Sequence, residues 1–120
     1  MDFRDNQPIY LQIAEMACER ILLGQWPSGG RIPSIRELAI EVQVNPNTVV
    51  RAYEFLEQKA IISNRRGVGF FADEDAVQKI RSFRREQFLE QEMPLFFRNL
   101  RLLDISIEEV QKRYETYQIS

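Results

Sequence analysis

Two helix-start signals lie close together in the chain and constrain its fold more than any other feature. Ser34-Ile35-Arg36-Glu37 matches a capping box, in which the serine hydroxyl accepts from the glutamate N–H and the glutamate reaches back. Asn45-Pro46 is the second signal, because asparagine is a favoured cap and proline suits the first helical position. Between them there is room for one short helix, about 35–42, and a three-residue turn. Two helices joined in this way indicate a helix-turn-helix.

Apolar residues recur at helical spacing on both sides of this turn. Pro8 suits the first position of an earlier helix, whose inner face carries Tyr10, Ile13, Ala14, Ala17 and Ile21. On the helix that follows Asn45, the inner face carries Val49, Ala52, Tyr53 and Leu56. The short helix at 35–42 has Ile35, Leu38, Ala39 and Val42 on one side. The three stripes predict three helices packed around one core.

Two short runs with strand character follow, 61–66 and 68–71, separated by Gly67. An isolated hairpin of this size is marginally stable, so it should pack on the helices through Ile61, Phe71 or both. The expected fold is therefore mainly α with a small β wing. It consists of a winged helix-turn-helix domain over residues 1–73 and a short α-helical dimerisation tail over residues 74–120.

The tail carries an apolar stripe but is too short to hold a core of its own. Met93-Pro94 should kink or break its helix, and Ser106 to Glu109 forms a capping box for a last helix. The stripe is expected to pack against a partner copy, against the first domain, or both. Its candidate dimer-interface residues are Val77, Ile80, Phe83, Phe88, Phe96, Phe97 and Leu100. A pocket for a small-molecule effector among the phenylalanines is the alternative, but aromatic stripes at helical spacing usually form cores.

The outer face of the helix after Asn45 is polar and points to a nucleic-acid contact. Asn47 and Arg51 lie near its N-terminus, where helix-turn-helix proteins insert side chains into the major groove. Asparagine pairs well with adenine and arginine with guanine, while Asn45 and Thr48 suit phosphate contacts. Glu54 would be repelled by phosphate and should stay outside. The alternative is an ordinary solvated helix face.

The predicted hairpin adds a second basic element. Arg65 and Arg66 at its tip suit the DNA backbone or a narrow minor groove, and Gly67 and Gly69 allow positive φ and close approach. Arg36, after the Ser34 cap, is placed to bind phosphate together with that serine. For the hairpin tip, the alternative is a turn whose charged side chains are merely solvated. For Arg36, the alternative is a salt bridge with a nearby glutamate.

Composition excludes several other functions. Net charge is −2, but the stretch from Arg31 to Ala72 has six basic and four acidic residues, so the middle is mildly basic. The absence of histidine excludes a Cys/His zinc site and histidine acid–base chemistry, and the single cysteine, Cys18, excludes an internal disulfide. No enzyme activity, metal or cofactor is expected. Without a membrane-length apolar run or a signal pattern, a cytoplasmic protein with no membrane partner is expected.

Residues 7–72 resemble the DNA-binding domain of the GntR family of bacterial repressors, most closely its YtrA-like subfamily. The resemblance rests on PIYLQIAE, the P-S-x-R-x-L-A run, NPNTVxRAYxxLE and RRGVGFF. It implies a homodimer, joined through a two-helix C-terminal part, that reads an inverted repeat in double-stranded DNA. By position it also supports Arg36 as a phosphate contact, Asn45 to Arg51 as the recognition helix and Arg65 to Gly69 as the wing.

Three positions depart from the pattern of this family. Pro46 stands where other branches often have arginine, and Gln43 and Ala60 stand at turns where glycine is usual. The expected function is a sequence-specific transcriptional regulator that acts as a repressor. The alternative is a winged-helix module that docks on another protein through its tail.

Overall fold

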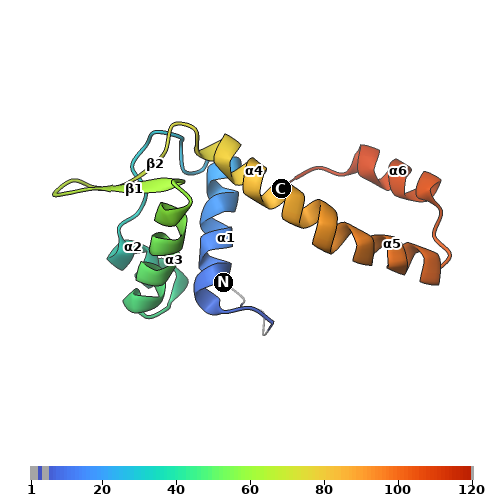
Figure 1. The fold of residues 1–120 in the computed structure, drawn as a ribbon, viewed down its shortest axis with the longest axis horizontal. Helices are drawn as coiled ribbons and strands as arrows, with labels where there is room; N and C mark the ends of the chain where they lie inside the picture. The colour runs from blue at the N-terminus through green and yellow to red at the C-terminus, as the bar shows by residue number, and fades with distance from the viewer. Residues whose placement is uncertain (1–2, 4–5, 120) are drawn as a thin grey trace. The chain divides into compact units, whose positions relative to one another are not determined.

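The structure, a computed structural model, describes residue 3 and residues 6–119 and divides into two compact units, Met1–Ser82 and Phe83–Ser120. The fold is mostly helical with a two-stranded antiparallel wing, as predicted (Figure 1). The elements of the first unit are α1 (Ile9–Leu22), α2 (Ile35–Val42), α3 (Pro46–Gln58), β1 (Ile62–Arg65), β2 (Gly69–Ala72) and the start of α4 (Ala76–Gln87). The predicted domain boundary at 73/74 stays a prediction.

Helices α1 and α3 pack against each other and contribute about half of the buried hydrophobic residues of the first unit (Figure 1). The two predicted stripes are buried, with Ile13, Ala14, Ala17 and Ile21 on α1 and Val49, Ala52, Tyr53 and Leu56 on α3. Tyr10, which shares the α1 stripe in sequence, is only partly buried. Its ring is therefore available to another side chain.

Both caps of the helix-turn-helix form as predicted. Ser34 Oγ accepts from the Glu37 N–H at 3.1 Å, and the Ser34 N–H donates to Glu37 Oε1 at 2.9 Å. The hydrogen bond from the Ser34 backbone lowers the pKa of the Glu37 carboxyl because it favours the charged form. At the start of α3, Asn45 Oδ1 accepts from the Asn47 N–H at 2.8 Å, and Pro46 follows the cap.

The hairpin packs on the helices through one of the two expected residues, Ile61, and through a second residue that was not expected. Ile61 is fully buried, as predicted, but it is Phe70 and not Phe71 that turns inward, with its ring edge 4.9 Å from the Tyr53 ring. The register pairs Arg65 with Gly69 and Ser63 with Phe71, so Phe71 lies on the outer face with Arg65. The Tyr53 hydroxyl donates to the Pro33 carbonyl at 2.7 Å, and burial raises the pKa of Tyr53. One aromatic side chain thus connects α3 to the wing and to the segment before α2.

A short segment before α2 extends the hairpin along its second strand. The Ile32 N–H donates to the Phe70 carbonyl and the Ala72 N–H to the Gly30 carbonyl, both at 2.9 Å. Arg31 lies between these bonds in an antiparallel bridge with Phe71. The pairing fixes Arg31 on the edge of the wing, a position that the sequence analysis did not anticipate.

The tail is helical throughout most of its length. After α4 come a π-helical turn, η1 (Phe88–Glu92), then α5 (Met93–Leu102) and α6 (Ile107–Thr116). Of the predicted kink or break at Met93-Pro94, a full break does not occur, because Met93 is in the right-handed helical region and Pro94 lies in the first turn of α5. The regular α-helix is nevertheless interrupted directly before this position, at η1. The π-helical turn just before the proline accommodates its missing N–H. The cap at Ser106 forms, with its hydroxyl accepting from the Glu109 N–H at 3.2 Å. In the described part of the chain, no helix has the length and apolar character needed to cross a bilayer.

The backbone is left-handed at both turn positions where glycine had been expected. Gln43 has a φ of 58° and Ala60 a φ of 59°. Left-handed backbone costs a residue with a Cβ about 1–2 kcal/mol. Replacement by glycine relieves this strain, but glycine also gives the unfolded chain more entropy, which lowers stability by about 0.4–1 kcal/mol. We therefore expect Ala60→Gly to raise the free energy of unfolding, measured by urea denaturation, by roughly 0.5–1 kcal/mol.

The same substitution inside a helix provides the control. Ala39→Gly in α2, at a buried helical position, should lower the free energy of unfolding by about 1 kcal/mol or more, because glycine disfavours the helix and also removes a buried methyl group. If Ala60→Gly raises the free energy of unfolding and Ala39→Gly lowers it, the gain at Ala60 comes from its left-handed backbone. If both substitutions lower it, the strain argument is wrong.

Candidate nucleic-acid interface

The exposed side of the first turns of α3 carries the polar residues expected to face DNA. Asn45, Asn47 and Arg51 are exposed and Thr48 is half-buried. The Asn45 carboxamide oxygen is used by the cap, so its NH₂ group is the part left to donate to phosphate. Glu54, which was expected to stay outside the DNA contact, is exposed on the same helix, about one turn after Arg51. The structure therefore brings Asn47, Thr48 and Arg51 together near the N-terminus of α3.

Arg51 is exposed but it is not isolated. Its guanidinium carbon lies 4.2 Å from the centroid of the Tyr10 ring on α1, which is a close cation–π contact. Arg51 therefore leans toward the start of α1, a direction that the helical spacing of α3 alone did not reveal.

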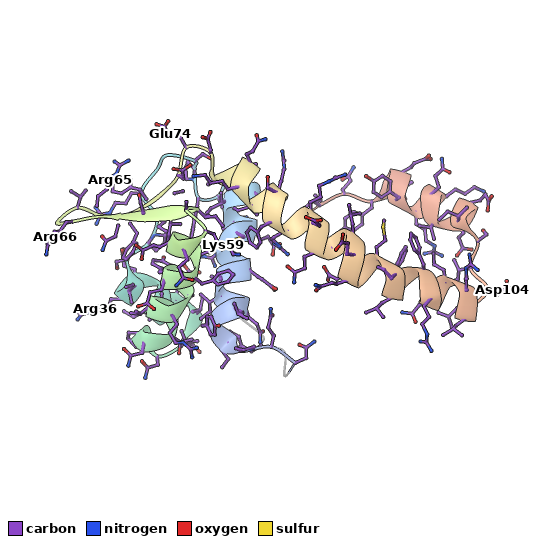
Figure 2. All side chains as sticks on the ribbon, viewed as in Figure 1. Arg36, Lys59, Arg65, Arg66, Glu74 and Asp104 are labelled. Carbon is purple, nitrogen blue, oxygen red and sulfur yellow. The ribbon has the colours of Figure 1, made fainter. Side chains whose placement is uncertain are left out.

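The wing presents its own basic side chains (Figure 2). Arg66 lies at the hairpin tip, and Arg65 beside it has its guanidinium carbon 4.0 Å from the centroid of the Phe71 ring. The backbone has positive φ at both wing glycines, 78° at Gly67 and 139° at Gly69, as their placement in the sequence indicated. The tip is thus a tight turn with two exposed arginines.

Arg31 joins this surface although the sequence analysis left it out of the candidate site. A Cβ at Gly69 would lie 3.0 Å from Arg31 Nε and 3.3 Å from Nη2, so the guanidinium occupies the space that the glycine leaves open. Arg31 pairs with Phe71 and Arg65 pairs with Gly69, which places both arginines on one face of the wing. The alternation of Gly30, Arg31 and Ile32 was the available signal, but it does not reveal the pairing partner.

Arg36 lies at the start of α2, beside the Ser34 cap (Figure 2). Within the described residues, no carboxylate forms an ion pair with Arg31, Arg36, Arg65 or Arg66. The ion pair on α2 is made instead by Glu41, with Arg20 of α1. The charge of Arg31 also helps to lower the pKa of Glu37, after the hydrogen bonds from Ser34. The salt-bridge alternative for Arg36 is thus not realised, and these guanidinium groups keep donors for an external anion.

Comparison with known proteins places the first unit in a family. A sequence profile described as bacterial regulatory proteins, gntR family, matches residues 9–72. The HTH-type transcriptional regulator YhcF of Bacillus subtilis is 33% identical over 96% of this chain and 93% of its own. The HTH-type transcriptional repressor YtrA of the same bacterium is 43% identical over 63% of this chain and 58% of its own.

Two solved structures extend the similarity over most of the chain. A GntR-family transcriptional regulator from Bacteroides thetaiotaomicron is 51% identical, with a TM-score of 0.68, and the match covers 89% of this chain and 93% of that one. A GntR-family regulator from Listeria monocytogenes is 31% identical, with a TM-score of 0.75, and the match covers 97% and 100%. The resemblance noted in the sequence motifs is confirmed. The chain belongs to the GntR family and is a DNA-binding transcriptional regulator with a winged helix-turn-helix domain.

Proposed function

We propose that the chain is a homodimeric repressor that binds an inverted-repeat operator, with α3 in the major groove and the wing on the adjacent backbone. The carrying observation is the polar N-terminal part of α3, beside a wing whose arginines have no ion-pair partner among the described residues. Asn47 and Arg51 supply base contacts. Arg36, Thr48 and the wing arginines supply phosphate contacts.

The tail supports a second copy as the partner. None of the described residues of η1, α5 and α6 is buried. Large apolar side chains are exposed there, including Phe88 at 50%, Phe96 at 46%, Phe97 at 44% and Tyr114 at 78%. Surfaces of this kind mark protein–protein contacts. Ile80, in contrast, is fully buried within its own chain, so the proposed interface is centred on the residues from Phe88 onward.

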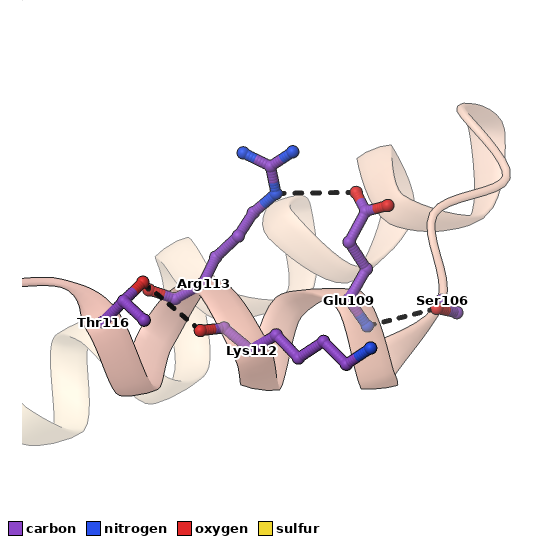
Figure 3. Close-up of polar contacts among 5 residues, drawn as sticks. All are labelled: Ser106, Glu109, Lys112, Arg113 and Thr116. Carbon is purple, nitrogen blue, oxygen red and sulfur yellow. Dashed lines mark hydrogen bonds and ion pairs between the residues drawn. The ribbon is translucent and has the colours of Figure 1, made fainter.

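Helix α6 has two distinct sides, which strengthens this argument. Figure 3 shows its polar side chains in local contacts: Arg113 Nε lies 3.6 Å from Glu109 Oε2, and the Thr116 hydroxyl donates to the Arg113 carbonyl at 3.2 Å. At 100° per residue, Ile107, Val110 and Tyr114 lie on the other side. That apolar side is what a second subunit would cover.

Repression is proposed because a dimer bound to a duplex obstructs other proteins at that site, and because YtrA is named a repressor. The alternative, a winged-helix module that docks on another protein through its tail, is less well supported. It gives no role to the group of arginines on the wing and α2.

Selection of binding sites from random duplex DNA tests the proposal. We expect an inverted repeat whose half-site centres are about 10 bp apart, or a small multiple, because a two-fold dimer places its recognition helices at that spacing. Selection of a site without an inverted repeat, or of no site at all, would contradict the proposal that a homodimer recognises DNA.

The role of Arg31 gives a separate prediction. Arg31→Ala should weaken binding to the selected site and to a scrambled duplex by the same factor, because a phosphate contact carries no sequence information. The slope of log K against log salt should become shallower by about 0.9, the value for one phosphate contact on duplex DNA. Measurement is by fluorescence anisotropy at several salt concentrations.

Arg81→Ala is the matched control, since Arg81 is exposed on α4 and its replacement changes net charge equally. It should leave the salt slope unchanged. Equal changes in slope for the two variants would mean that Arg31 acts only through overall charge.

A further inference from the structure

The contact between Tyr10 and Arg51 joins a scaffold helix to the predicted base-reading residue. Its distance of 4.2 Å is shorter than those from Arg20 to the Trp26 ring, 5.6 Å, and from Lys59 to the Phe55 ring, 5.5 Å. The guanidinium is therefore close enough to rest on the ring and not merely near it.

The start of α1 is well anchored, so Tyr10 is a fixed platform. The buried Gln12 donates through Nε2 to the Gln7 carbonyl at 2.9 Å, and Gln7 Nε2 donates to Glu15 Oε1 at 3.0 Å. The Leu11 N–H donates to the Pro8 carbonyl at 3.1 Å. These bonds order the first turn of α1, and α1 packs against α3, so the Tyr10 ring is held beside α3.

A stacked guanidinium still has its hydrogen-bond donors available. The five N–H groups of arginine lie in the guanidinium plane, whereas stacking uses only its face. Arg51 remains exposed and makes no ion pair among the described residues. Contact with the two acceptors on a guanine edge requires that plane to be oriented, and an arginine that is already held loses less rotamer freedom on binding.

We propose that Tyr10 is a positioning residue for sequence readout, whose ring orients the Arg51 guanidinium toward the base edge in the major groove. This inference rests on the proposed base-reading role of Arg51. The Tyr10 hydroxyl has no part in it, so the aromatic face alone should be required.

The test measures affinity for two duplexes at one salt concentration: the site selected from random DNA by the wild-type protein, and a scrambled duplex of the same composition. The variants are Tyr10→Leu, Tyr10→Phe, Arg51→Ala and the double variant Tyr10→Leu/Arg51→Ala. Tyr10→Leu should lower affinity for the selected site about 2- to 5-fold, the size of an exposed cation–π contact, and leave the scrambled duplex unaffected. Tyr10→Phe should bind as the wild type, and Tyr10→Leu should add no loss when Arg51 is already alanine.

Three results would overturn the inference. Equal losses on both duplexes, or additive losses in the double variant, would mean that Tyr10 acts through folding alone. A gain in affinity for the selected site on Tyr10→Leu would mean that the ring holds Arg51 away from DNA. Should Tyr10→Leu not fold, Tyr10→Met retains an apolar side chain without a ring and is held to the same outcomes.

The design separates this inference from the proposed function. If Arg51→Ala leaves base preference unchanged, the base-reading role of Arg51 is wrong. If Arg51→Ala relaxes base preference but Tyr10→Leu has no effect, only the positioning role of Tyr10 is wrong.

Discussion

Arg51→Ala should lower affinity for the selected site by about 5- to 150-fold, because a bidentate arginine–guanine contact contributes about 1–3 kcal/mol of discrimination. Binding to scrambled DNA should change much less, since phosphate contacts dominate nonspecific affinity. A second selection with the variant should recover sites that tolerate any base at one position of each half-site. Measured affinities for single-base variants of the site would identify that position.

The contrasting variant is Arg66→Ala at the wing tip. An arginine that contacts backbone should contribute equally to all sequences, so both duplexes should be bound more weakly by the same factor, with a shallower salt slope. Should Arg51→Ala and Arg66→Ala each weaken selected and scrambled DNA equally, the division between base reading by α3 and backbone contact by the wing is wrong.

Features specified by neighbouring residues were predictable from the sequence. The caps at Ser34 and Asn45 form because each depends on a side chain and a backbone N–H within three residues. The stripe on α3 is buried because a helix places such residues on one face whatever its partner. These local rules were sufficient to place the candidate recognition helix.

Features that depend on pairing between distant segments were not predictable in the same way. The choice between Phe70 and Phe71 as the inward residue follows from the hairpin register, and a shift of one residue would reverse it. Arg31 reaches the wing only because residues 30–32 pair with β2. The contact between Arg51 and Tyr10 likewise requires α1 to lie beside α3.

The second large effect is expected in the tail. Phe96→Glu places a charge among exposed apolar side chains of α5, beside Phe97, whose ring centroid lies 6.1 Å from that of Phe96. If a second copy covers this surface, burying an unpaired carboxylate there is strongly unfavourable. We expect analytical ultracentrifugation to show a monomer where the wild type is a dimer. Operator affinity should fall by roughly a hundredfold or more, because two linked half-site contacts become independent.

Gln91→Glu is the matched control, since Gln91 is exposed on η1 and its replacement adds the same charge without removing apolar surface. It should remain dimeric and bind the operator as the wild type does. Thermal unfolding of the first unit should be unchanged in both variants, because α5 has no buried residue among those described. A Phe96→Glu protein that stays dimeric with full operator affinity would place the dimer contact elsewhere. A wild-type protein that is monomeric and binds a single half-site would contradict the proposed dimer, because one subunit would then account for the whole affinity.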